Sequence, residues 1–202
     1  MLDVNEFEND HFILRVDSPY SLNYLIFVQN VFLNNRDGSH HFPSVDSSKW
    51  NLLQHDDFQA KFKSIWDEVV RKNTQSPHYD YNGVLESDAP LYRQLFEGNV
   101  KGDYGFSESI RLFQSWWGSI FFGKGAVEMV YVAEGSEIYD ELAIAIKSKN
   151  LMIPNNQLTI MLLYDKQTIV AQNITPYHYL LPMEELFLNK NNIVMNILNN
   201  LP

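Results

Sequence analysis

The sequence predicts an α+β protein in which a helical N-terminal half packs with a small, mostly antiparallel sheet and helices in the C-terminal half. Two observations favour this class. Apolar residues recur at helical spacing through the first half, and short β-rich runs then appear among further helices. The regular strand–helix alternation of a doubly wound fold is missing. We expect a single domain over residues 1–202, the alternative being a helical part at 1–100 followed by an α+β part at 101–202.

The first half is expected to contain three helices. The first is predicted to begin at Ser18-Pro19, with serine as the N-cap and proline in the first helical position. It is apolar on nearly every side as far as Leu33, so we expect it to be buried. A second helix is predicted around Phe58–Val69, where apolar residues share one face. A short helix is expected at about Asp88–Phe96.

The stretch FQSWWGSIFFGKG, residues 113–125, continues a helix that is expected to begin near Ser107. Burying large aromatic side chains is strongly stabilising, so most of its apolar stripe is expected in the core. Gly123-Lys124-Gly125 is interpreted as a helix stop before a strand, because a phosphate loop needs its glycines after a strand and before a helix. The stripe consists of Ile110, Phe113, Trp117 and Ile120, widened by Trp116 and Phe121.

The second half is expected to supply the sheet. Ala126–Val132 has strand composition, and a helix is predicted from Gly135-Ser136 onward. Leu158–Tyr164 and Thr168–Gln172 are interpreted as two strands joined by a tight turn, which would be the antiparallel hairpin of the sheet. A helix and a last amphipathic segment are expected after Pro182.

Composition limits the classes of function. The formal net charge of −10 disfavours nucleic-acid binding and anionic membrane surfaces, which both require basic residues. The absence of cysteine excludes disulfides, thiolate catalysis and cysteine metal sites. The acidic N-terminus does not resemble a signal peptide, and the longest apolar stretch, Tyr24–Leu33, is too short to cross a membrane. We therefore expect a soluble cytoplasmic protein.

Four residues are candidates for catalysis, although no nucleophile motif accompanies them. Glu128 lies in the middle of the predicted strand AVEMVYV, on a face with Val130 and Val132, where an unpaired carboxylate would have a perturbed pKa; a solvent-facing edge strand is the alternative. His78 and Asp80 belong to a polar, aromatic loop, and His178 completes the set. No cofactor and no metal site are predicted, because no histidine pair has i,i+4 spacing and His40-His41 fits only a loop.

An acid-only run is the most distinctive electrostatic feature. It predicts an acidic patch that could dock a basic partner, the alternative being a solvated helix start. A tryptophan at the edge of the aromatic stripe, either Trp116 or Trp117, would be a suitable binding hot spot beside it. Beyond Glu128, the run consists of Glu134, Glu137, Asp140 and Glu141.

Three functions remain open, and no motif is specific enough to indicate a family. The first is binding of another macromolecule, in the manner of an inhibitor or immunity protein that neutralises a basic toxin or nuclease. The second is an enzyme whose carboxylate and histidine site is assembled from scattered residues. The third is a module that binds a small molecule in an aromatic-lined cavity between the helical part and the sheet. The oligomeric state is left open.

Overall fold

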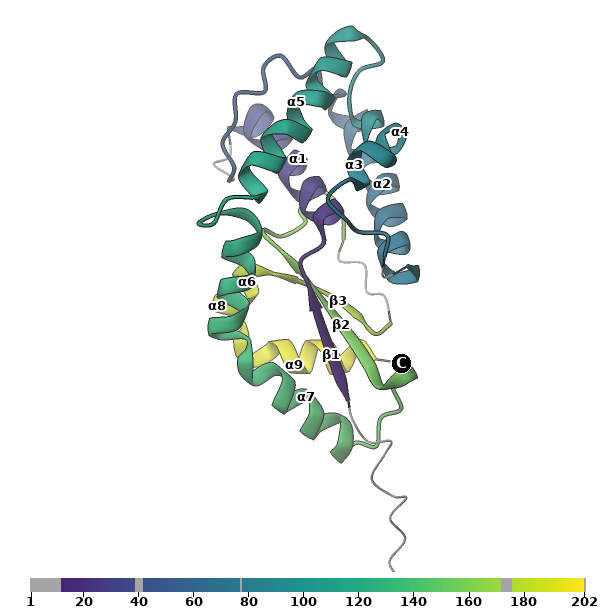
Figure 1. The fold of residues 1–202 in the computed structure, drawn as a ribbon, viewed down its shortest axis with the longest axis vertical. Coiled ribbons are helices and arrows are strands. Elements are labelled where there is room, and N and C mark those ends of the chain that lie inside the picture. The colour runs from purple at the N-terminus through teal and green to yellow at the C-terminus, as the bar shows by residue number, and fades with distance from the viewer. Residues whose placement is uncertain (1–11, 39–41, 77, 172–175, 202) are drawn as a thin grey trace, which may run out of the picture.

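The protein consists of two layers, a helical one and one built around a sheet (Figure 1). This computed structural model describes residues 12–38, 42–76, 78–171 and 176–201. The helical layer contains α1 (Tyr20–Asp37), α2 (His55–Gln75), α3 (Val84–Ser87), α4 (Ala89–Tyr92), the 3-10 turn η1 (Arg93–Leu95) and α5 (Val100–Trp117). The other layer contains β1 (Ile13–Asp17), α6 (Gly123–Glu134), α7 (Ser136–Ser148), the 3-10 turn η2 (Pro154–Asn156), β2 (Gln157–Leu163), β3 (His178–Pro182), α8 (Met183–Leu188) and α9 (Lys190–Asn199).

The sheet corrects the predicted fold class. Its three strands lie in the order β1-β2-β3 and all of them are parallel, so the expectation of a mostly antiparallel sheet is wrong. The predicted strand at Leu158–Tyr164 is confirmed as β2, the central strand. Thr168–Ala171, the described part of the expected second hairpin strand, is not a strand. The neighbours of β2 are instead β1 and β3, which the sequence reading did not identify.

Buried amide side chains on α1 give a physical reason why no hairpin forms. The Gln29 side-chain oxygen accepts hydrogen bonds from the backbone N–H groups of Thr168 and Ile169, at 2.9 and 3.2 Å. The Asn23 side-chain oxygen accepts from the N–H of Tyr164 at 2.8 Å. Both amides are fully buried. Because α1 holds these groups, the segment after β2 follows the helix and is not paired back along the strand.

The predicted strand at Ala126–Val132 is also wrong, because these residues form most of α6. Val127 is buried on one side of the helix, whereas Glu128 is exposed and accepts a hydrogen bond from the Ser18 hydroxyl. Glu128 therefore does not share a strand face with Val130 and Val132. The run has β-branched composition, but packing of one helical face against the neighbouring elements decides its conformation.

Gly123-Lys124-Gly125 begins α6, which corrects its interpretation as a helix stop. Gly118 is the C-cap of α5, and five residues later Gly123 has a φ of +59°. A side chain at Gly123 would place its Cβ 2.5 Å from the Cα of Trp117, so both the left-handed backbone and the close approach require glycine. The start of α6 is thereby fixed against the end of α5.

The core of the helical layer is aromatic and surrounds Phe113, which is fully buried on α5. The rings of Tyr20, Tyr24 and Phe27, all from α1, lie 5.0–5.6 Å from the ring of Phe113 with edge-to-face orientations. Such pairs add to the stabilisation that comes from burial. The predicted helices at the start of α1 and at Phe58–Val69 are confirmed, and α1 is buried along most of its length as expected. Within the described ranges, no helix combines the length and apolar character needed to cross a membrane.

Candidate functional site

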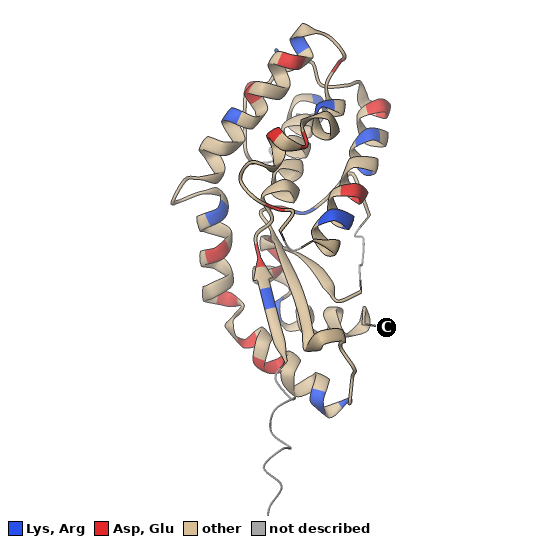
Figure 2. Ribbon diagram, turned by 45° about the vertical axis from the view of Figure 1, so that its right-hand side comes forward, with Lys and Arg blue, Asp and Glu red and all other residues tan. Residues whose placement is uncertain are grey.

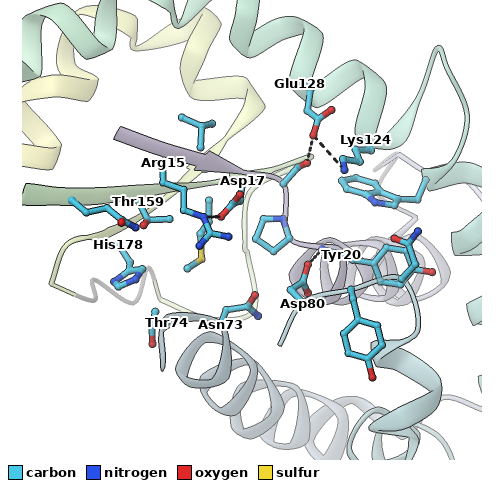
Figure 3. A pocket seen from close by; sticks show the side chains of 18 residues that line it. Arg15, Asp17, Tyr20, Asn73, Thr74, Asp80, Lys124, Glu128, Thr159 and His178 are labelled. Atoms are coloured by element: carbon cyan, nitrogen blue, oxygen red, sulfur yellow. Dashed lines mark hydrogen bonds and ion pairs between the residues drawn. The ribbon is translucent and has the colours of Figure 1, made fainter. Parts of the chain in front are cut away.

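A cleft of about 230 Å³ lies between the helical layer and the sheet (Figure 3). Its floor is the sheet face that carries Arg15 and His178. One wall is the start of α6, with Lys124 and Glu128. The opposite side consists of the end of α2 and the following loop, which contains Asp80. Junctions between structural layers are common places for ligand sites.

Strand register places three polar side chains in one row across the floor. Arg15 on β1 is the partner of Thr159 on β2, and Thr159 is in turn the partner of His178 on β3. Partners in neighbouring strands share a sheet face, and strands lie about 4.8 Å apart. Figure 3 shows the three side chains facing the same space, with Asn73 and Thr74 approaching it from α2.

The imidazole of His178 is oriented by the backbone. Its Nδ1 lies 3.1 Å from the carbonyl oxygen of Pro176. A carbonyl can only accept a hydrogen bond, so Nδ1 carries the proton in this contact. In the neutral ring, Nε2 is then unprotonated. It can accept a proton or a hydrogen bond from a bound molecule.

The other ionic groups of the cleft are already paired. Nε of Arg15 lies 2.5 Å from the carboxylate of Asp17, which is on the same strand face. Nζ of Lys124 lies 3.6 Å from the carboxylate of Glu128, one helical turn along α6. Glu128 also accepts a hydrogen bond from the Ser18 hydroxyl at 2.7 Å. Each positive group of the cleft therefore has its charge balanced by a carboxylate beside it.

Asp80 caps α1 from a distant loop. Its two carboxylate oxygens accept hydrogen bonds from the backbone N–H groups of Tyr20 and Ser21, at 2.5 and 2.8 Å. Burial raises the pKa of the Asp80 carboxyl, although these hydrogen bonds lower it in part. The capping role expected of Ser18 is thus filled by Asp80, because α1 begins at Tyr20 and the Ser18 side chain points to α6.

Three of the four candidate catalytic residues meet at this cleft. Glu128, Asp80 and His178 all line it, although they come from α6, a loop and β3. His78 is exposed and is not among the described residues of the lining. The sequence reading missed Arg15 and Thr159. The alternation of polar and apolar residues through Arg15 and Asp17 was the available signal, but the segment was not recognised as a strand.

The structure does not place an exposed tryptophan beside the acid-only run, as was expected for the partner surface. Trp117 is buried, and Trp116 is half-buried with its indole among Phe27, Phe42 and Tyr164, so neither presents an exposed indole. Nε1 of Trp116 is buried and has no hydrogen-bond partner among the described residues.

The exposed apolar residues of this region lie in the loop between α5 and α6. Ile120 and Phe121 belong to this loop, although both were expected in the core. Ile120 is 75% exposed and Phe121 79% exposed, because α5 ends at Trp117 and the stripe does not continue beyond it. Phe122 is half exposed, and its ring stacks on that of Phe42 at 5.9 Å. This loop carries an apolar patch that the helical stripe did not predict.

The acid-only run follows α6 and the first turns of α7 (Figure 2). Asp140 and Glu141 are exposed. Lys190 of α9 lies 3.8 Å from Glu134 and 3.6 Å from Glu137, so a distant lysine balances part of the run. The patch is therefore less negative than the local sequence indicates.

A second, wider groove of about 920 Å³ lies on the helical layer, between the end of α1, residues 47–54 and the approach to α5. Arg36 and Glu97 are the ionisable side chains among the described residues that line it. Amide and hydroxyl groups dominate the rest, and none of the candidate residues lies there. In the described ranges, no three His, Asp or Glu side chains are grouped so as to hold a metal ion. His40 and His41 lie outside the described residues.

Comparison with known proteins gives no guide to function. No family model matches the chain, and neither the curated proteins nor the solved structures contain a significant match. The residues of the cleft and of the exposed loop are therefore the basis for inferring what the protein does.

Proposed function

We propose that the protein binds a small polar molecule in the cleft between its two layers. The observation that carries this proposal is the convergence on one cavity of five polar side chains, each from a different segment: Arg15, Thr159, His178, Asp80 and Glu128. Ligand sites are concave and use precisely placed polar groups to orient the bound molecule, and this cleft is more polar than most of them. We also place the protein in the cytoplasm, because a chain without cysteine suits a reducing compartment.

The same groups could support acid–base chemistry on the bound molecule. Nε2 of His178 is available as a proton acceptor because Nδ1 is engaged with Pro176. Thr159 lies next to it in the strand register and presents a hydroxyl to the same face. A ligand hydroxyl placed over Thr159 would therefore lie within reach of a base whose tautomer is already fixed.

The test is a thermal-shift screen of the full chain against a panel of small metabolites. A ligand that binds only the folded state raises the melting temperature by mass action. We expect at least one compound to stabilise the wild type and to lose this effect in His178→Gln. His78→Gln is the matched control, because His78 is exposed outside the lining and its variant should respond as the wild type does. A panel without any stabilising compound, or an equal response in His178→Gln, would contradict the proposal.

A second candidate function is binding of a protein partner, and the exposed loop between α5 and α6 favours it. Contiguous exposed apolar side chains often mark interaction sites, and Ile120, Phe121 and Phe122 follow each other here. The formal charge of −10 suits a basic partner, such as a toxin or nuclease that the protein would neutralise.

The partner hypothesis is tested by affinity purification at low salt, where an electrostatic complex is strongest. We expect a stoichiometric basic protein to copurify with the wild type and to be lost with Phe121→Ser. Met152→Ser is the control, since Met152 is 92% exposed but lies at the approach to β2, away from this loop. Equal recovery with both variants would exclude the loop as the contact surface.

A further inference from the structure

The charge pairing in the cleft restricts the class of ligand that it can take. Arg15 is paired with Asp17 and Lys124 with Glu128, at 2.5 and 3.6 Å. Both oxygens of Asp80 accept backbone N–H groups of α1. Neither pair leaves a charge over to balance that of a charged ligand, and a charged group that loses hydration without a counter-charge is costly. A neutral ligand leaves every one of these contacts in place.

The paired groups retain hydrogen-bonding capacity for such a ligand. A carboxylate offers about four lone-pair sites and a guanidinium five N–H donors, so one contact does not saturate either group. Asp17 and Glu128 thus remain acceptors, and Arg15 remains a donor. His178 adds an acceptor at Nε2, and the Thr159 hydroxyl can donate and accept. The cleft therefore mixes donors and acceptors at close intervals, which matches a molecule whose own groups are hydroxyls.

The size and the apolar part of the lining limit the ligand further. A cavity of about 230 Å³ is smaller than the roughly 300–1,000 Å³ typical of drug-sized ligands. Tyr81, which is half exposed, and Trp117 contribute aromatic rings to the lining. Aromatic faces beside hydrogen-bonding groups suit a compact ring that has C–H groups on its faces and hydroxyls at its edge.

We infer that the ligand of the cleft is a neutral, polyhydroxylated molecule about the size of a single sugar ring. This inference rests on the proposed function, because it names the class of molecule that the same cleft binds. Its hydroxyls would lie over the row formed by Arg15, Thr159 and His178.

The test compares uncharged probes with charged ones, and D-glucose with its charged derivatives forms the matched set. The uncharged set is D-glucose, D-ribose and myo-inositol, and the charged set is gluconate, glucosamine and glucose 6-phosphate. Binding to the ¹⁵N-labelled full chain is followed by NMR titration, with the amide signals of Thr159 and His178 as reporters of the cleft. We expect an uncharged probe to shift these signals, and its charged analogue to bind at least about tenfold more weakly, corresponding to about 1.4 kcal/mol.

Variants separate cleft binding from weak binding elsewhere. Thr159→Val keeps the side-chain shape and removes the hydroxyl, so it should weaken binding of the uncharged probe at least about fivefold. Thr168→Val is its matched control, since Thr168 is exposed outside the cleft and should leave the affinity unchanged. The comparison of charged with uncharged probes needs only the wild type, so it stands even if Thr159→Val does not fold.

The outcomes distinguish the ligand class from the proposed function itself. If a charged analogue shifts the signals of Thr159 and His178 at least as strongly as the uncharged probe, the ligand class is overturned and the cleft remains a binding site. If no probe of either set shifts them, the inference is overturned. The proposed function then fails as well if the metabolite screen also gives no stabilising compound that depends on His178.

Discussion

Removing the Asp80 carboxylate should destabilise the protein, because it caps the longest buried helix of the first half. In the wild type, Asp80 accepts the N–H groups of Tyr20 and Ser21 at 2.5 and 2.8 Å. Asp80→Ala removes both acceptors. Asp80→Asn keeps one oxygen but turns an N–H₂ group toward the second backbone N–H, so only one of the two bonds survives.

The magnitude follows from the two bonds and what replaces them. A hydrogen bond to a charged group contributes about 1.5–3 kcal/mol, and loss of a helix N-cap costs about 0.5–2 kcal/mol. Tyr20 lines the cleft, where water can reach its freed N–H group, whereas Ser21 is fully buried. The burial cost of the carboxylate is relieved at the same time. We therefore expect Asp80→Ala to lower the free energy of unfolding by about 1.5–3 kcal/mol, and Asp80→Asn by about half as much.

The pH dependence of this effect has a definite sign. Burial raises the pKa of the folded-state Asp80 carboxyl above its ordinary value of 3.8. Between the unfolded and folded pKa values the folded protein binds more protons, so the stability contributed by this group falls as pH rises. This pH-dependent part is fully present below about pH 3.8 and is lost as the pH rises through the folded pKa, above which the hydrogen bonds of the ionised carboxylate remain. The advantage of the wild type over Asp80→Ala should therefore shrink with increasing pH.

The assay is urea unfolding of the wild type and both variants, followed by tryptophan fluorescence and circular dichroism at several pH values. Other acidic groups titrate in all three proteins, so the difference between them isolates Asp80. An Asp80→Ala variant within about 0.5 kcal/mol of the wild type would refute the capping role. An advantage that grows with pH would show that the helix dipole and hydrogen bonds outweigh burial, which would refute the electrostatic part of the reasoning.

Two further predictions concern packing in the helical layer. Gly105→Ala would place a Cβ 1.9 Å from the carbonyl oxygen of Trp50. We therefore expect it to lower the free energy of unfolding by about 1–3 kcal/mol in urea unfolding. Gly98→Ala is the control and should be near neutral, because its Cβ would meet no atom within 4 Å. Phe113→Ala should lower the free energy of unfolding by about 3–5 kcal/mol, because its ring is fully buried among other aromatic rings. Phe121→Ala should change the melting temperature little, because that ring is 79% exposed. Equal losses within either pair would contradict the packing described.

The sequence predicted the elements whose signals are local. Phe58 and its neighbours at helical spacing define α2, and the apolar run after Pro19 defines α1. The apolar residues of β2 were likewise recognised as a strand. These segments could be predicted because their own side chains determine both conformation and burial.

The elements that were missed depend on distant residues. Gln29 interrupts an apolar run, and only the fold reveals that it binds the backbone of Thr168 and Ile169 and so redirects the chain after β2. The composition of α6 favours a strand, but Val127 is buried on one face of a helix. Tertiary contacts override local preference in both cases.

Part of the candidate site was predicted, but only from the types of residue involved. His178, Asp80 and Glu128 were selected by residue type, and folding brings them to one cleft. Their contacts were not predictable, because the capping of α1 by Asp80 and the pairing of Glu128 with Ser18 join residues far apart in the chain. The row that includes Arg15 depends on strand register, which no local pattern specifies.

The order of strands in the sheet has a consequence for folding during synthesis on the ribosome. β1 is synthesised before the helices from α1 to α7, but its partner β2 is synthesised after them. Any nascent chain that ends before Gln157 leaves the edge of β1 unpaired, and exposed strand edges are prone to aggregation. β1 and β2 can therefore pair only after all of these helices have been synthesised, and a cut near residue 100 would separate the two strands.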